Sequence, residues 1–180
     1  RFAQGDVGAG KGMTCHDLKG GIGSSSRIIE IGEERFTLGV LVLTNHGSMK
    51  DLTIGGKNIG MDIERQIRED TPDEGSCIII VATDLPVGSR QLGRIIRRSS
   101  VGLARLGSYI GHGSGEVMIG FSTANRIPLD GDMLNYRCIH ESQIDKAFRA
   151  VAEATEEAVI LSMVHAHTVI GYSGKIRRSL

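Results

Sequence analysis

Residues 73–84 read DEGSCIIIVATD, and they join a polar stretch to a short, unbroken apolar run. The run 77–82, CIIIVA, has the length and the β-branched content of a strand that is buried on both faces. Residues 57–75, which end in this junction, are rich in acidic side chains and contain a proline, as a surface loop does. The pattern predicts that an exposed loop meets a buried strand at the bond between Gly75 and Ser76.

The segments around this strand show both strand-like and helix-like patterns. Upstream, the apolar and β-branched runs 27–31 and 36–43 predict a β-hairpin, and the glycine-rich residues 5–26 predict a loop. Three further elements are expected downstream: a helix at 91–107, a strand at 117–122 and a long helix at 141–167. Together these elements indicate an α+β protein built from layers of sheet and helix.

The composition restricts the class of function. The 180 residues carry 21 basic and 21 acidic side chains, so neither nucleic acid nor a membrane surface is expected as a partner. The three cysteines have no CxxC spacing, which favours a reducing compartment. The neighbouring pairs Cys15 with His16 and Cys138 with His140 each offer too few ligands for zinc. We therefore expect no metal site and no cofactor.

The bond between Gly75 and Ser76 has the residue types that self-cleavage by an N-to-O acyl shift requires. Glycine leaves its carbonyl carbon open to the serine hydroxyl and tolerates a strained backbone. Hydrolysis of the resulting ester would place a free amine on Ser76 beside its hydroxyl. That amine can accept the hydroxyl proton, as in enzymes with an N-terminal threonine. Because Gly-Ser pairs before strands are common, the pair alone does not establish this chemistry.

Longer blocks of the sequence resemble one family. They are GDVGAGKGMTC at 5–15, KGGIGSSSR at 19–27, GSCIIIVATD at 75–84, GLARLGSY at 102–109, GSGE at 113–116 and FSTAN at 121–125. Over nearly the whole chain, the sequence is similar to the self-processing serine aminopeptidases of the DmpA type. This family includes D-aminopeptidases, L-aminopeptidase-esterases and β-peptidyl aminopeptidases.

The resemblance implies a set of catalytic residues. Ser76 matches the first residue of the family's small subunit and inherits the role of nucleophile. Ser114 and Glu116 fall where the family has its other catalytic side chains, and their spacing places them on one face of an extended chain. Glu116 would hold or accept a proton that Ser114 orients or transmits. Asn45 matches an asparagine that donates to the oxyanion. Taken alone, these residues also fit a turn serine, a solvated glutamate and an Asx turn.

The resemblance also implies a fold, an αββα sandwich akin to the N-terminal-nucleophile hydrolases. Residues 1–180 would be part of a single hydrolase domain, with 1–75 the end of the large subunit and 76–180 the small subunit after self-cleavage. Family members have about half a domain further upstream, which supplies part of the pocket, including a tyrosine. We therefore expect the sandwich to be incomplete in this sequence. Residues 57–75 and the cysteine at position 77 depart from the family pattern.

The expected activity is the release of N-terminal amino acids from small peptides, amides or esters, through an acyl-enzyme on Ser76. The resemblance implies a homo-oligomer of processed heterodimers. The expected location is the cytoplasm, or the periplasm if a signal peptide precedes this sequence. The sequence leaves open whether the substrate carries a D-, an L- or a β-amino acid.

Two other functions remain open at this point. The chain could belong to a catalytically silent family member that serves as a binding or structural module. It could also belong to an N-acyltransferase of the related ornithine acetyltransferase fold, although that group uses a threonine nucleophile where this chain has Ser76.

Overall fold

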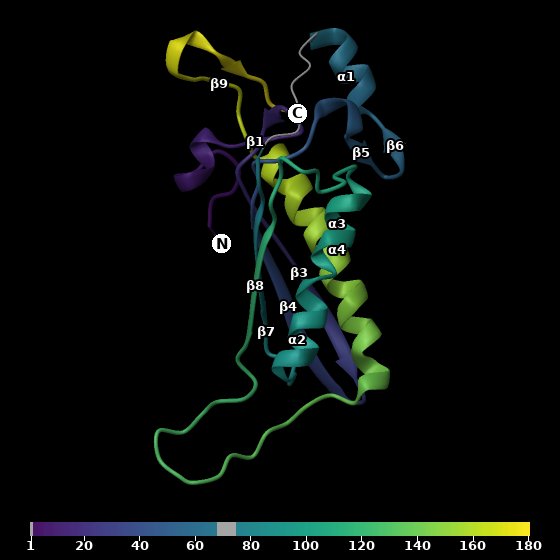
Figure 1. Cartoon of the computed structure of the whole chain (residues 1–180), viewed down its shortest axis with the longest axis vertical. Coiled ribbons are helices and arrows are strands. Elements are labelled where there is room, and N and C mark those ends of the chain that lie inside the picture. The colour runs from purple at the N-terminus through teal and green to yellow at the C-terminus, as the bar shows by residue number, and fades with distance from the viewer. Residues whose placement is uncertain (1, 68–74) are drawn as a thin grey trace.

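A computed structural model describes residues 2–67 and 75–180, and its centre is a four-stranded sheet with helices on one face (Figure 1). In order across the sheet, the strands are β3 (Ile22–Ile31), β4 (Glu34–Leu43), β7 (Ile78–Thr83) and β8 (Val117–Ser122). The first three strands run antiparallel to one another, whereas β8 runs parallel to β7. The α+β fold class and the strand at 117–122 are confirmed.

The hairpin of β3 and β4 begins earlier in the chain than the sequence pattern predicted. Ile31 pairs with Glu34 across a two-residue turn, and Gly32 has the positive φ (+60°) that such turns need. Part of the glycine-rich segment 5–26 is strand rather than loop, because β3 already starts at Ile22. Gly23 explains this difference, since a Cβ there would lie 1.8 Å from the carbonyl oxygen of Ala158. Glycine at this position allows strand and helix to pack in direct contact.

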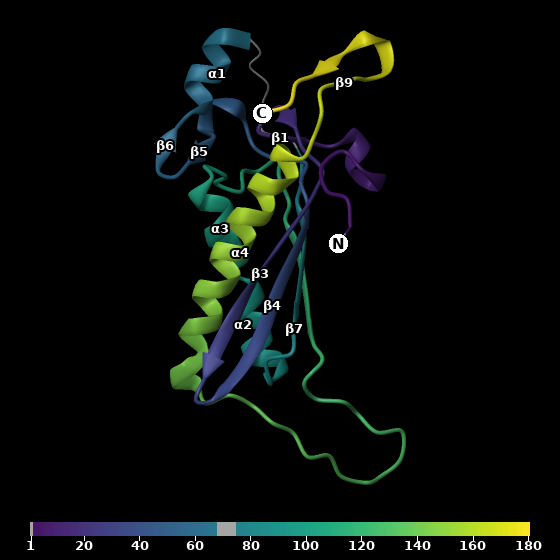
Figure 2. The ribbon, with the colours of Figure 1, turned by 180° about the vertical axis from the view of Figure 1, so that it is seen from behind.

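Three helices cover one face of the sheet, as Figures 1 and 2 show from opposite sides. They are α2 (Ser89–Ile96), α3 (Ser99–Arg105) and α4 (Ile144–Val164). Helix α4 lies along β3 and β4 and confirms the predicted long helix, while α3 packs against α4. The single helix predicted at 91–107 is wrong, because the chain breaks between α2 and α3. Within the described ranges, no helix is both long and apolar enough to cross a membrane.

The opposite face of the sheet is apolar and exposed. Residues on this face that are 41–53% exposed are Ile28, Ile78, Val117, Ile119 and Phe121. Burial alternates along β7, where Ile79 and Val81 are fully buried. Within the described residues only the helix-facing side of β7 is fully buried, so the predicted burial of both faces is reached on one face here. The described residues provide one sheet layer and one helix layer.

The polar stretch 57–75 is not the continuous loop that its composition indicated. It begins with β6 (Lys57–Asn58), which pairs with β5 (Thr53–Ile54), and continues into the helix α1 (Gly60–Ile67). Asn58 lies just before this helix, and its Oδ1 accepts a hydrogen bond from the backbone N–H of Met61 in the first turn (3.2 Å). The rest of the predicted loop, at 68–74, lies outside the described residues. Shorter elements complete the fold: η1 (Gly8–Gly12), β1 (Thr14–Cys15), β2 (Leu18–Lys19), η2 (Met49–Asp51), η3 (Glu141–Gln143), β9 (Val169–Ile170), η4 (Tyr172–Gly174) and β10 (Ile176–Arg177).

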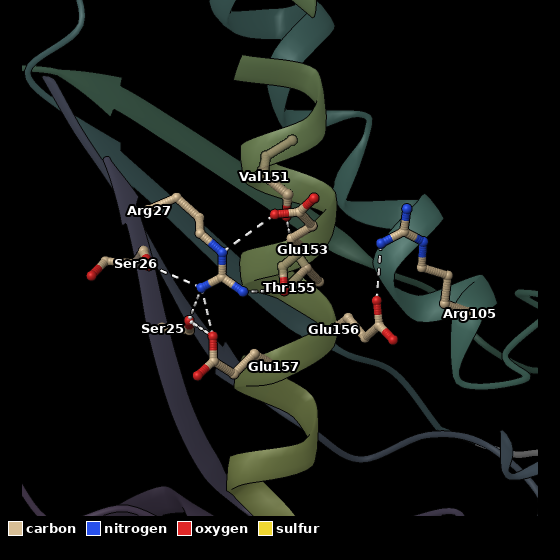
Figure 3. A network of polar contacts seen from close by, with 9 residues as sticks. All are labelled: Ser25, Ser26, Arg27, Arg105, Val151, Glu153, Thr155, Glu156 and Glu157. Carbon is tan, nitrogen blue, oxygen red and sulfur yellow. Dashed lines mark hydrogen bonds and ion pairs between the residues drawn. The ribbon is translucent and has the colours of Figure 1, made fainter. Parts of the chain in front are cut away.

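A polar network joins β3 to α4 at the edge of the sheet (Figure 3). Arg27 on β3 forms ion pairs with Glu153 and Glu157 on α4. Ser25 also donates a hydrogen bond to Glu157. The hydrogen bonds from Ser25 and from Arg27 hold the pKa of the Glu157 carboxyl below its ordinary value, although partial burial acts in the opposite direction. These ion pairs and hydrogen bonds add to the apolar contact between α4 and β3.

Replacing Glu157 with glutamine is expected to lower the free energy of unfolding by about 0.5–1 kcal/mol at pH 7, as partly exposed ion pairs do. A carboxylate with a lowered pKa stabilises the fold above its unfolded pKa and loses this effect as the pH falls through the folded pKa. The difference between the two proteins should therefore shrink below about pH 4. Urea unfolding at pH 7 and pH 3 measures this, with the exposed Glu33→Gln as the control. A difference that does not change with pH would contradict the assignment.

Candidate active site

The topology of the sheet brings the predicted site residues to one end of it, uppermost in Figure 1. Because β7 is antiparallel to β4 and parallel to β8, the end of β4 lies beside the beginnings of β7 and β8. Asn45 follows β4, Ser76 precedes β7, and Ser114 and Glu116 precede β8. Residues from three distant parts of the sequence are thus gathered around the bond between Gly75 and Ser76.

The backbone at this bond is held from both sides. The N–H of Ser76 donates to the carbonyl oxygen of Asn45 (2.6 Å), and the N–H of Gly75 donates to Gly113 (3.2 Å). The carbonyl oxygen of Gly75 accepts from the N–H of Gly115 (3.2 Å). The side chain of Ser76 is exposed, and its hydroxyl donates to this same Gly75 oxygen (2.6 Å). The hydroxyl therefore lies against the carbonyl group that it would attack in self-cleavage.

Gly75 has a conformation that only glycine adopts readily. Its φ is +153°, and a Cβ at this position would lie 2.0 Å from the carbonyl oxygen of Asn45. The same Cβ position is 3.5 Å from Nδ2 of Asn45, so the asparagine amide faces the junction. The glycine that the sequence analysis linked to self-cleavage is thus required by the local packing.

Replacing Gly75 with alanine should misplace the junction. Because the new Cβ collides with backbone and takes up a strained φ, we expect a loss of stability of about 1–3 kcal/mol. A displacement of about 1 Å at a reacting carbonyl costs about 100-fold in rate, so self-cleavage should slow by at least that factor. The fraction of cut chain over time measures the effect. Gly93→Ala is the control, since its Cβ would meet nothing within 4 Å. Equal processing of the two variants would contradict the role of Gly75.

Ser114 and Glu116 form a hydrogen-bonded pair beside the junction. The hydroxyl of Ser114 donates to Oε1 of Glu116 (3.0 Å). Oε2 of Glu116 is buried and has no hydrogen-bond partner among residues 2–67 and 75–180. Between the two residues, Gly115 faces Ser76, because a Cβ there would lie 3.7 Å from Oγ of Ser76. The pair is therefore placed next to Ser76 with one carboxylate oxygen still available to accept a proton.

The orientation of the Asn45 amide is fixed by the glycine-rich segment. Its Oδ1 accepts hydrogen bonds from the backbone N–H and from the hydroxyl of Thr14 (3.3 and 3.4 Å). With the oxygen held there, the NH₂ group is turned toward Gly75. A donor so placed suits the negative charge that develops on a carbonyl oxygen under attack.

A residue that the sequence analysis did not single out, Lys19, holds the glycine-rich segment together. It is 1% exposed, and its ammonium group donates to the carbonyl oxygens of Gly10 (2.8 Å), Met13 (2.7 Å) and Gly20 (2.7 Å). These bonds fix the loop that carries Thr14 and, through it, Asn45. Its place in the block at 19–27 was the available signal, but nothing in the spacing indicated a buried ammonium.

Replacing Lys19 with methionine keeps the apolar stem and removes the charge. We expect a loss of about 3 kcal/mol in the free energy of unfolding, because three carbonyl oxygens, two of them buried, lose a charged donor. Denaturant unfolding measures this loss. Lys11→Met is the matched control, since Lys11 is exposed in the same segment and should change stability little. Similar values for both variants would show that Lys19 does not hold the loop.

Other reactive groups near the junction are poorly suited to be the nucleophile or its base. Burial raises the pKa of Cys15 to about 12, although a hydrogen bond with Thr44 opposes the shift. Burial, together with Cys15 and Glu116, also raises the pKa of Cys77 well above its ordinary value. Burial and then the neighbouring His16 lower the pKa of His46 to about 3, so this ring is neutral and weakly basic. The exposed hydroxyl of Ser76 is thus the better placed nucleophile.

Comparison with known proteins identifies the family. The family model described as Peptidase family S58 matches residues 1–177. The β-peptidyl aminopeptidase BapA of Sphingosinicella xenopeptidilytica is 40% identical over 184 residues, which cover 94% of this chain and 46% of that protein.

Two solved structures have the same fold. The PH0078 protein from Pyrococcus horikoshii superposes with a TM-score of 0.91 and 43% identity over 100% of this chain and 50% of its own. The second is the L-aminopeptidase D-Ala-esterase/amidase of Ochrobactrum anthropi, which is described as a prototype of the serine aminopeptidases and a variant of the N-terminal-nucleophile hydrolase fold. It superposes with a TM-score of 0.89 and 33% identity over 99% of this chain and 50% of its own. The chain spans about half the length of these relatives. It belongs to peptidase family S58 and has the DmpA-like variant of the N-terminal-nucleophile hydrolase fold.

Proposed function

We propose that this chain is the nucleophile-bearing part of a serine aminopeptidase, whose Ser76 is freed by self-cleavage of the bond after Gly75. The observation that carries the proposal is the hydroxyl of Ser76, which lies 2.6 Å from the carbonyl oxygen of Gly75. Asn45 and the Ser114–Glu116 pair flank this bond. Membership of a peptidase family, and relatives that are named aminopeptidases, support this function over a catalytically silent role or an acyl transfer.

Self-cleavage proceeds by transfer of an acyl group from nitrogen to oxygen. Oγ of Ser76 attacks the carbonyl carbon of Gly75, and its proton passes to Glu116 by way of Ser114. The N–H of Gly115 and the amide of Asn45 stabilise the negative oxygen. The C–N bond then breaks, and the proton is delivered to the leaving amine of Ser76. Water hydrolyses the ester and leaves a carboxylate on Gly75.

The same groups serve the catalytic cycle once Ser76 is the first residue of the small subunit. Its hydroxyl attacks the carbonyl carbon of the substrate's N-terminal residue, and the proton moves to the Ser114–Glu116 pair or to the free α-amine. The leaving amine takes that proton as the acyl-enzyme ester forms. Water then releases the amino acid and restores Ser76. The substrate class is small peptides, amides and esters with a free amine.

The two products of self-cleavage remain together as a processed heterodimer, 1–75 with 76–180. Strand β4 from the first part pairs along β7 from the second, with Leu38 to Leu43 opposite Thr83 to Ile78. The exposed apolar face of the sheet is the surface on which the upstream half of the family fold would place the second sheet of the sandwich. We also propose that these heterodimers form homo-oligomers and that the protein is located in the cytoplasm or the periplasm.

Hydrolysis of amino-acid anilides by the longest natural form of the polypeptide tests this function. Substrates with a free amine, in D-, L- and β-forms, are compared with the same compounds blocked by an N-acetyl group. We expect release of the amine only from unblocked substrates. A processed protein that hydrolyses none of them would favour the silent module. Acetyl transfer from N-acetylornithine to glutamate, without hydrolysis, would favour the acyltransferase.

A further inference from the structure

Three side chains of metal-ligating types lie together where the hairpin β1–β2 contacts the segment after β4. They are Cys15, His16 and His46, which are 0%, 0% and 3% exposed. Their ligand atoms all lie within 4.8 Å of one another. We propose that these three residues bind one transition-metal ion with the preferences of zinc. The inference is independent of the peptidase chemistry.

His46 gives the first reason. Both of its ring nitrogens are buried, and neither has a hydrogen-bond partner in the part of the chain that the structure describes, 2–67 and 75–180. A buried polar atom without a partner is rare in native proteins and calls for an explanation such as a bound ion. An imidazole nitrogen with its lone pair free is also the commonest metal ligand in proteins. A metal ion would satisfy one of these two nitrogens.

His16 gives the second reason, because its tautomer is fixed. Its Nδ1 lies 3.0 Å from the carbonyl oxygen of Ser48, which only accepts, so Nδ1 carries the proton. In the neutral ring, Nε2 therefore carries the lone pair. A histidine whose second nitrogen donates to a backbone carbonyl is the usual arrangement at metal sites. The ring packs directly against Gly47, where a Cβ would lie 2.6 Å from Nδ1 of His16.

The local backbone brings the three ligands together. His16 and Asp17 form the turn of the β1–β2 hairpin with φ of +49° and +61°, a conformation that non-glycine residues adopt at a cost. The N–H of His16 donates to the carbonyl oxygen of His46 (2.8 Å). Cys15 and His46 form an isolated parallel β-bridge. Sequence spacing offered only the adjacent Cys15 and His16, and the fold supplies the third ligand from a separate segment.

The donor set selects the class of ion. Thiolate and imidazole favour zinc or copper(I) over magnesium or calcium, which prefer oxygen ligands. Bonds of about 2.0–2.3 Å to zinc place ligand atoms roughly 3.5 Å apart, so the side chains close in on the ion by about an ångström. The thiol of Cys15 loses its proton to solvent as the sulfur–metal bond forms, and binding releases one proton. Since the cluster is buried, the ion enters while the chain folds.

Metal content after expression with added zinc is the first measurement, on the longest natural form of the polypeptide. We expect one zinc ion per chain, retained through gel filtration. Cobalt substitution should give a thiolate-to-cobalt charge-transfer band in the near ultraviolet. Cys15→Ser should abolish this band, and His46→Asn should lower zinc retention at least about tenfold, as loss of a metal contact does. The surface pair provides the control, since Cys138 and His140 are exposed and Cys138→Ser with His140→Gln should change neither result.

A second measurement uses only the wild-type protein and a surface variant, so it does not depend on the folding of the ligand variants. One equivalent of zinc added during refolding should raise the unfolding temperature of the wild-type protein and of the Cys138→Ser variant equally. Wild-type protein that retains no zinc and shows no cobalt band would overturn the proposal. Binding that persists in folded Cys15→Ser and His46→Asn proteins would do the same, because it would show that zinc sits elsewhere.

Discussion

The variant Ser76→Ala should neither cleave itself nor hydrolyse amino-acid amides. The hydroxyl that contacts the Gly75 carbonyl oxygen is the reacting atom in both steps, and alanine removes it. Loss of a serine nucleophile lowers hydrolysis by about 10⁴-fold or more in serine hydrolases. Because the side chain of Ser76 is exposed, the substitution should leave stability almost unchanged. Rates of anilide hydrolysis and the mass of the chain measure the two effects.

Ser100→Ala is the control for this experiment. Ser100 lies on α3, outside the group of residues around the junction, and its hydroxyl donates to the carbonyl oxygen of Arg97 one turn earlier (2.7 Å). It should process and hydrolyse like the wild-type protein. Hydrolysis by folded Ser76→Ala at the wild-type rate would remove Ser76 from the mechanism and leave the gathered residues as scaffold.

The variant Glu116→Gln should lower the rate of hydrolysis by about 10²–10⁴-fold, the usual contribution of a positioned proton acceptor. Glutamine keeps the shape and can still accept the hydrogen bond from Ser114, but it does not take up a proton. We expect the loss in kcat rather than in KM, because the proton moves only in the transition state. Glu116→Gln should also slow self-cleavage, so steady-state kinetics is related to the amount of cut chain when both constants are measured.

Glu33→Gln serves as the control, because Glu33 is exposed in the turn between β3 and β4, at the far end of the sheet. Ser114→Ala should resemble Glu116→Gln if the pair acts as a unit. A Glu116→Gln protein with an unchanged kcat would assign the proton transfer to the α-amine of Ser76 alone.

The sequence predicted the elements whose pattern is set by periodicity. The apolar stripe of α4 and the short apolar run of β8 were both found where they were expected. The predictions from the sequence were wrong where contacts between distant segments decide the local structure. Gly23 reads as loop but lies in a strand, because its missing side chain admits the backbone of α4. The polar residues of α1 were interpreted as loop, although the side chain of Asn58 accepts a hydrogen bond from the first turn of a helix there.

The candidate site was predicted from blocks that resemble a family, not from spacing. The contact between Ser114 and Glu116 follows from their alternation, and the structure places both beside Gly75. The position of Asn45 depends on the pairing of β4 with β7, which the sequence did not specify. Lys19 and His46 were not predicted because their partners come from distant segments, and only the fold shows that these side chains are buried.

The most direct test of the proposed mechanism is the intact mass of the longest natural form of the polypeptide after denaturation. Self-cleavage predicts two chains, one of them beginning at Ser76, and a single uncut chain in the Ser76→Ala variant. A wild-type protein that remains one uncut chain under conditions where it is folded would contradict the proposal that Ser76 becomes an N-terminal nucleophile.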